Sequence, residues 1–136
     1  MRYFFIAAFL FFVQTASALE VHVADKTVYD VKIPKTQEEK EKGLMFVREM
    51  PQNQGMLFDL RGYPFAAMWM KNTYIPLDML FIDCDFKVVD IYENAEPLSL
   101  KKISSNKSFC YVLEINGGET KKHNILIGDQ LKIHSS

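Results

Sequence analysis

Two apolar runs, each of strand length, constrain the fold of this chain more than any other feature. Residues 65–70 are apolar throughout, and residues 77–82 are apolar apart from Asp78. Each run is too short to indicate a helix with a buried face. The connection between them contains Pro76, which biases the residue before it toward an extended backbone. We therefore expect two neighbouring strands joined as a hairpin, buried on both faces at the centre of the fold.

Shorter strand signals continue along most of the chain. Residues 19–23 and 29–33 alternate apolar and polar side chains, which predicts a hairpin with one buried face. Strands at this spacing, separated by turn residues, are typical of sandwiches and barrels. We expect a mostly β fold, a single compact β-sandwich or partly closed barrel of about eight strands with two short helices. The remaining strand-length runs lie at 56–60, 87–92, 109–115, 125–127 and 130–134.

The helix signals are short. Thr36 and Glu39 match the capping box that begins a helix, and Gly43 is suited to end it. These residues predict a helix over 37–42 that would not be stable alone. A second short helix is expected at 119–123. The chain has no regular alternation of strands and long helices, which argues against a doubly wound parallel sheet.

The first 18 residues have the pattern of a secretory signal. Arg2 precedes an apolar stretch, and Ala16-Ser17-Ala18 is a small-residue cleavage motif. We expect cleavage after Ala18 and an exported protein, periplasmic or secreted, with residues 19–136 forming a single globular β-rich domain. An uncleaved anchor is the alternative. Because Leu19 and not Cys follows the motif, a lipoprotein is not expected, and no later run is long enough to span a membrane.

Charge and cysteine content narrow the environment. The signal contains one of the 16 basic residues and none of the 17 acidic ones. The mature chain is therefore slightly acidic, which argues against nucleic-acid binding. Cys84 and Cys110 could form a disulfide in an oxidising compartment, and two buried free thiols are the alternative.

A cluster of polar and aromatic residues around the central stretch is the candidate ligand-binding site. An aromatic face beside amide, hydroxyl and charged groups suits a small molecule, a sugar, a peptide or an anion. A carboxylate in an apolar run needs a partner, so Asp78 either binds ligand or fixes the turn. We expect Lys71 or the amides of the neighbouring turn to supply that partner. The candidate residues are Trp69, Lys71, Asn72, Thr73 and Asp78, with Arg48 and Glu114 as possible co-liners.

Three other functions remain open. Asp78 and Glu114 could form the acid/base pair of a hydrolase, although the chain has no nucleophile elbow, zincin motif or P-loop. Met68 and Met70 could bind Cu(I), because thioethers select that ion, but methionine is also a common core residue. A structural or protein-partner role is the third. No cofactor is expected.

The sequence resembles the domain of unknown function 192 family, small bacterial and archaeal proteins that are often exported. The resemblance covers nearly all of residues 19–136 and implies a compact, mostly β domain. It implies no activity, since the family has no established biochemical function. The residues that carry it are Gly43-Leu44-Met45-Phe46 with Arg48, Gly55-Met56-Leu57-Phe58, Trp69-Met70-Lys71-Asn72-Thr73, Ile75-Pro76-Leu77-Asp78, Tyr111-Val112-Leu113-Glu114, Gly118 and Gly128-Asp129.

Overall fold

The computed structural model describes residues 19–135, which form seven strands and two short helices. The mostly β architecture expected from the sequence is confirmed. The predicted signal segment lies outside the described residues, so its cleavage stays a prediction. Within 19–135 no helix has both the length and the apolar character needed to cross a membrane. The elements are β1 (Leu19–Val23), β2 (Thr27–Lys32), α1 (Gln37–Lys42), β3 (Gln54–Asp59), β4 (Leu77–Ile82), β5 (Val88–Ala95), β6 (Tyr111–Asn116), α2 (Glu119–Lys122) and β7 (Leu131–Ser135).

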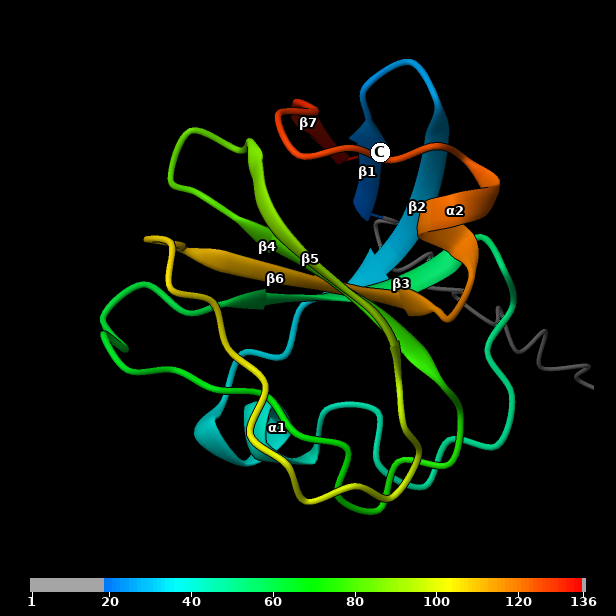
Figure 1. Ribbon diagram of the computed structural model, residues 1–136, viewed down its shortest axis with the longest axis vertical. Coiled ribbons are helices and arrows are strands. Elements are labelled where there is room, and N and C mark those ends of the chain that lie inside the picture. The colour runs from blue at the N-terminus through cyan, green and yellow to red at the C-terminus, as the bar shows by residue number, and fades with distance from the viewer. Residues whose placement is uncertain (1–18, 136) are drawn as a thin grey trace, which may run out of the picture.

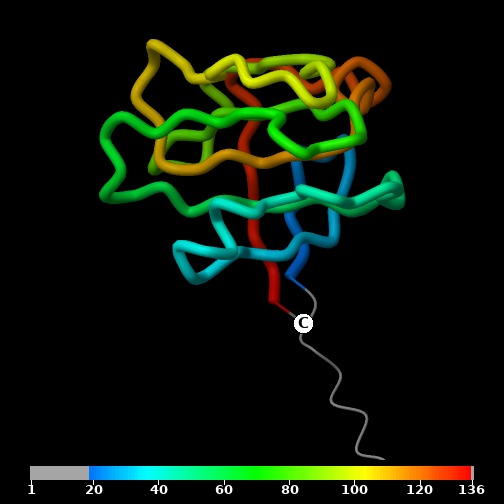
Figure 2. The backbone as a smooth tube through the Cα atoms, turned by 90° about the horizontal axis from the view of Figure 1, so that it is seen from below, coloured from blue at the N-terminus to red at the C-terminus, as the bar shows by residue number. Residues whose placement is uncertain are grey.

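The strands form one curled sheet in the order β5-β4-β6-β3-β2-β1-β7 (Figure 1). The first and last strands of the chain lie side by side, as the blue and red ends of the tube show (Figure 2). The Leu131 amide donates to the Phe86 carbonyl at 2.7 Å, and the Val88 amide donates to the Asp129 carbonyl at 2.9 Å. These bonds join the segment before β7 to the segment around the start of β5. The sheet is therefore a partly closed barrel and not a sandwich.

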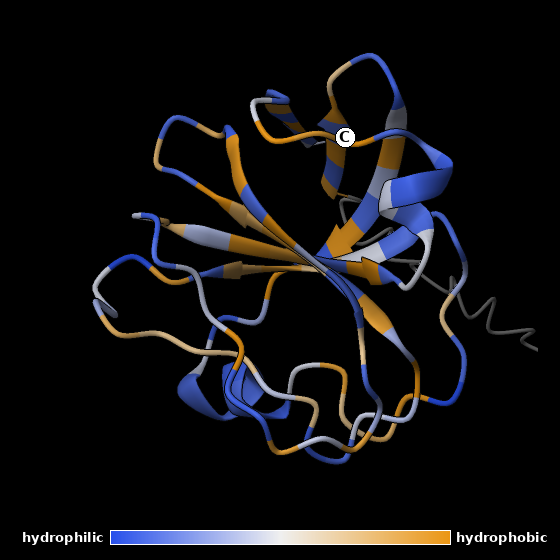
Figure 3. Cartoon of the chain, viewed as in Figure 1, coloured by the Kyte–Doolittle hydropathy of each residue, from blue (hydrophilic) through white to orange (hydrophobic). Residues whose placement is uncertain are grey.

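One strand pair is parallel. β2 and β3 run in the same direction, and the chain between them passes through α1. The predicted cap of this helix is present, because the Thr36 side chain accepts a hydrogen bond from the Glu39 amide. All residues of α1 are hydrophilic, as the blue ribbon in Figure 3 shows, and none is buried. The helix is held through the residues that follow it, beginning with the buried Leu44.

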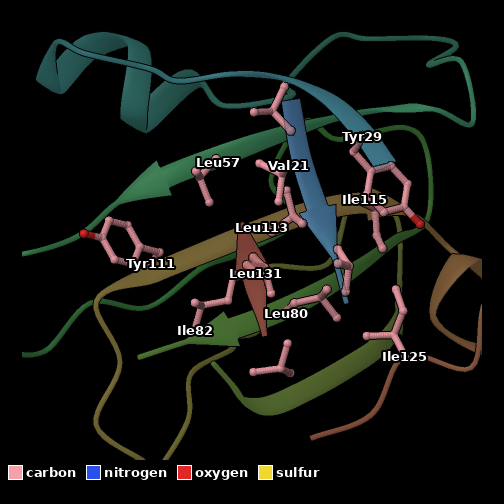
Figure 4. Packing of buried hydrophobic residues seen from close by; sticks show 13 residues of the cluster. Val21, Tyr29, Leu57, Leu80, Ile82, Tyr111, Leu113, Ile115, Ile125 and Leu131 are labelled. Carbon is pink, nitrogen blue, oxygen red and sulfur yellow. The ribbon is translucent and has the colours of Figure 1, made fainter. Parts of the chain in front are cut away.

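Two apolar cores lie on opposite faces of the sheet. The inner core fills the barrel with residues such as Tyr29, Leu80 and Ile115 (Figure 4). The outer core covers the other face of β3, β4 and β6 and includes Phe58 and Met79. Because side chains alternate along a strand, each of these strands contributes to both cores. The outer core is enclosed by loops and by the segment after α1, and it positions the candidate site.

Two predicted strands are absent from the structure. Residues 65–70 form no strand, and their only β-type pairing is the bridge between Met68 and Ile103. The predicted hairpin with 77–82 is therefore wrong: this segment crosses the outer face of the sheet and pairs with another loop. Residues 125–127 form no strand and lead into a turn, in which the Asp129 amide donates to the Leu126 carbonyl at 3.0 Å and the Leu126 amide donates to the Asp129 carboxylate at 2.9 Å. The expected burial of 65–70 on both faces is also wrong, because Phe65 is 96% exposed and Met70 is the one fully buried residue of that run.

Cys84 and Cys110 form a disulfide, with their Cα atoms 5.2 Å apart. Cys84 lies just after β4, and Cys110 lies just before β6. These strands are antiparallel neighbours, so their adjoining ends bring the two residues together. The Cys110 amide also donates to the Ile82 carbonyl at 2.8 Å. The bridge therefore extends the β4–β6 pairing beyond its last strand residues.

Candidate functional site

A cavity of about 300 Å³ lies between α1 and the outer face of the sheet. In Figure 1 this is the region around α1, on the side of the sheet away from β1 and β7. Its volume is at the lower end of the range for small-molecule sites. The lining combines apolar side chains with charged groups, namely Gln37, Lys40, Glu41, Lys42, Gly43, Leu44, Met45, Phe58, Leu60, Tyr63, Ala66, Ala67, Met68, Trp69, Lys71, Thr73 and Glu114.

Glu114 contributes a carboxyl group to this cavity. It lies in the middle of β6, and its register partners are Met56 and Met79. Its side chain is 5% exposed and has no hydrogen-bond partner among residues 19–135. Burial raises the pKa of Glu114 from 4.5 to about 8. At neutral pH the group is therefore mainly a neutral carboxylic acid, able to donate a hydrogen bond.

Two lysine–aromatic pairs lie along the cavity lining. The Lys71 ammonium is 5.1 Å from the centre of the Trp69 ring, and the Lys40 ammonium is 5.0 Å from the centre of the Tyr63 ring. Trp69 is 45% exposed, so it lies at the mouth and not in the core. A second, more open hollow adjoins the cavity and shares Trp69, Lys71 and residues 41, 42 and 45 with it.

Two of the predicted residues, Asn72 and Thr73, lie in the turn after Trp69 and have different roles. Thr73 is buried and lines the cavity, and its hydroxyl donates to the Lys71 carbonyl at 3.1 Å. Asn72 does not line the cavity. It adopts a φ of 53°, a conformation that Asn tolerates better than most residues, and its carbonyl accepts from the Phe46 amide at 2.9 Å. Asn72 therefore connects this turn to the segment after α1.

The structure places Asp78 outside this cavity. It is fully buried and pairs in register with Ile115, which places it on the barrel side of the sheet. Its carboxylate accepts from three backbone amides, those of Asn94 at 2.8 Å, Thr120 at 2.9 Å and Gly118 at 3.3 Å. None of these partners was expected from the sequence. Asp78 joins β4 to β5 and to the start of α2, which is a structural role.

Arg48, named as a possible co-liner, is not among the residues that line the cavity. It is exposed, and its guanidinium is 5.6 Å from the centre of the Tyr74 ring. Tyr74 in turn makes an edge-to-face contact with Phe46. These residues form an aromatic and cationic surface that reaches the second hollow only through Phe46.

The methionine pair is divided between core and cavity. Met70 is fully buried in the outer core, and Met68 is partly buried against the same cluster while also lining the cavity. This geometry assigns both residues a packing role. The hypothesis of a Met-x-Met pair on one strand face loses its basis, because residues 65–70 are not a strand.

The family model described as "DUF192: Uncharacterized ACR" matches residues 19–133. The chain belongs to the DUF192 family. This confirms the resemblance drawn from its motifs, and the family description names no activity. None of the curated proteins matches the chain.

Two solved structures resemble this DUF192 fold closely. A protein of unknown function from Novosphingobium aromaticivorans DSM 12444 is 36% identical, with a TM-score of 0.77 over 83% of each chain. A proposed transcription regulator from Sinorhizobium meliloti 1021 is 40% identical, with a TM-score of 0.75 over 85% of this chain and 92% of that one.

Sequence reasoning missed the contribution of α1 to the DUF192 cavity. Lys40 and Lys42 line it together with Tyr63, and none of the three was a candidate. A signal was present, because Gly43 ends the helix and is followed by apolar residues that bring its last turn onto the sheet. The path of residues 60–70 could not be predicted from the sequence, and these residues form the cavity wall opposite α1.

Proposed function

We propose that this protein is a binding module that takes a small ligand into the cavity beside Glu114. The observation that carries the proposal is the carboxyl group of Glu114, which is almost fully buried, faces the cavity and has no hydrogen-bond partner among residues 19–135. Its oxygens reach the cavity space, because the fully enclosed side-chain atom without a partner among residues 19–135 is Thr120 Oγ1 and not an oxygen of Glu114. A ligand in the cavity can therefore hydrogen-bond to Glu114, whose hydrogen-bonding capacity the fold leaves unused.

Binding is better supported than hydrolysis by a carboxylate pair. A pair of catalytic carboxyl groups must flank one bond of the substrate. The side chains of Asp78 and Glu114 point to opposite faces of the sheet, and the Asp78 carboxylate already accepts hydrogen bonds from three backbone amides. The adjoining hollow beyond Trp69 gives room for a ligand that extends from the cavity across the surface.

We place this function outside the cytoplasm. The pattern of residues 1–18 supports export, and so does the disulfide between Cys84 and Cys110, because disulfides persist mainly in oxidising compartments. N-terminal sequencing of the exported protein tests the assignment. A chain that begins at Leu19 supports it, and a protein that keeps Met1 contradicts cleavage.

A thermal-shift screen of residues 19–136 against sugars, peptides, small organic anions and metal ions tests the binding function. Any ligand that binds only the folded state raises Tm by mass action. The paired variants are Ala67→Trp, which adds bulk to the cavity lining, and Val28→Trp, which introduces the same side chain at an exposed position on β2. We expect the shift to disappear in the first variant and to persist in the second. A screen without a hit, or a shift unaffected by Ala67→Trp, contradicts the proposal.

A further inference from the structure

We propose, on the basis of the binding function above, that the cavity takes a small organic anion with an apolar body. Its anionic group is held by lysines at the mouth, and an uncharged oxygen at its other end accepts a hydrogen bond from Glu114. Three features of the cavity support this ligand class. They are the protonation state of Glu114, which we call the floor, the charge of Lys40, Lys42 and Lys71 at the mouth, and the apolar composition of the walls.

The floor favours an uncharged ligand atom. Because burial raises the pKa of Glu114 to about 8, the carboxyl group carries its proton at neutral pH and presents a hydroxyl donor. A ligand ammonium would require the carboxylate form of Glu114, so both charges would have to lose hydration beside a buried strand residue. A ligand hydroxyl or carbonyl oxygen requires neither the ionisation of Glu114 nor the burial of a ligand charge.

The mouth favours an anion. Lys40, Lys42 and Lys71 line the cavity, and Glu41 is the only acidic side chain besides Glu114 among its lining residues within 19–135. Two of these ammonium groups are held over aromatic rings, Lys40 by Tyr63 and Lys71 by Trp69. Neither makes a salt bridge among residues 19–135, so both remain able to pair with a ligand carboxylate. With Glu38 and Glu41 of the adjoining hollow included, the three ammonium groups still outnumber these two carboxylates.

The walls favour an apolar body of limited size. Leu44, Phe58, Leu60 and Met68 line the cavity with apolar side chains. A cavity of about 300 Å³ admits a short alkyl chain or a single ring, and not an oligosaccharide. Among the ligand classes compatible with the sequence, small organic anions therefore match the cavity better than sugars do.

The same arrangement makes binding sensitive to pH. The titratable groups that face the cavity besides Glu114 are Lys40, Glu41 and Lys42 from α1, and Tyr63 and Lys71 from the opposite wall. As the pH rises past about 8, Glu114 ionises, loses its donor and places a negative charge near the bound anion. We therefore expect the affinity for an anion to fall over this range.

A matched set of three probes tests the ligand class: 6-hydroxyhexanoate, 6-amino-1-hexanol and 1,6-hexanediol. They share a chain length and one hydroxyl and differ in the charge at the other end. Trp69 is the single tryptophan of the chain and lies at the mouth, so its fluorescence reports binding, with calorimetry as the second readout. We expect 6-hydroxyhexanoate to bind about tenfold more tightly than either of the other probes at pH 6.5.

The variants separate the two ends of the site. Lys40→Gln/Lys71→Gln should remove the preference for the anion, whereas Lys132→Gln on exposed β7 should leave it unchanged. Raising the pH from 6.5 to 9 should weaken anion binding in the wild type and leave it constant in Glu114→Gln.

Equal binding of the three probes, or preference for the cation, overturns the inference. If no probe binds while the screen finds a ligand sensitive to Ala67→Trp, the ligand class is wrong and the binding function stands. If that screen is silent too, both fail.

Discussion

Asp78 and Glu114 point to opposite faces of the sheet, although they occupy adjacent positions on the paired strands β4 and β6. Asp78 is opposite Ile115 and Glu114 is opposite Met79, so a one-residue offset sends one carboxyl group into the barrel side and the other into the outer cavity. The first is bound by three amides, and the second has no partner among residues 19–135. Two buried acids of similar sequence context therefore have different chemistry.

Asp78→Ala should destabilise the protein by about 3 kcal/mol, because it leaves buried backbone amides of β5 and the α2 turn without an acceptor. Asp78→Asn should cost less, since it keeps one acceptor oxygen. Urea unfolding followed by circular dichroism measures both. Ligand affinity of the folded variants should match the wild type, because Asp78 faces away from the cavity. A loss of ligand affinity without a loss of stability would indicate that Asp78 takes part in binding.

Glu114 should make folding stability fall with rising pH. Its pKa is about 8 in the folded state and near 4.5 when exposed, so between these values the folded protein keeps a proton that the unfolded chain releases. The free energy of unfolding should therefore decrease across this window by up to about 1.4 kcal/mol per pH unit. Urea titrations from pH 5 to 9 should show this slope in the wild type and a flatter one in Glu114→Gln. Glu93→Gln, at an exposed position, is the control, and an unchanged slope in Glu114→Gln would contradict the assignment.

The contrast between these two acids shows how far the sequence could lead. Alternation and turn residues located the strands well, because burial of one face imposes a period of two. The same reasoning singled out Asp78 because it interrupts an apolar run, and it named Glu114 as a possible co-liner. It could not assign their faces, which depend on the register of β4 against β6. Register is a property of paired strands and of the bulge in the β4–β5 pairing between Leu77 and Met79, and neither is encoded locally.

The stretch 65–70 illustrates the other limit. Its composition indicated burial for Met70, but Phe65 and Trp69 of the same run are exposed, so the apolar run fixed neither burial nor backbone pairing residue by residue. The run crosses the outer core as an irregular segment, held by the bridge between Met68 and Ile103. The cavity depends on this path, because the segment forms the wall opposite α1. The candidate site was therefore predictable in part, through Trp69, Lys71, Thr73 and Glu114, while its lysines on α1 were not.

Loss of the disulfide should lower stability by about 3–4 kcal/mol, as expected for a loop closed between residues 26 positions apart. Cys84→Ser/Cys110→Ser and each single variant should lose similar amounts, since either change opens the loop. Unfolding of the oxidised wild type with and without reductant measures the same quantity. A wild type insensitive to reductant, with all thiols reactive before treatment, would contradict the bridge.

Gly55→Ala should be the most disruptive of the glycine substitutions near the site. A Cβ at this position in β3 would lie 2.6 Å from the carbonyl oxygen of Glu114, a backbone atom that cannot move without disturbing the β3–β6 ladder. We expect a loss of about 2–4 kcal/mol, together with weaker ligand binding, because the same displacement moves the Glu114 side chain in the cavity. Gly62→Ala is the comparison, since its φ of 87° imposes strain but a Cβ there meets nothing within 4 Å. That variant should lose about 1–2 kcal/mol and keep its affinity. Urea unfolding and probe titration of the two proteins decide the matter, and a Gly55→Ala protein as stable as Gly62→Ala would show that the ladder can absorb the contact.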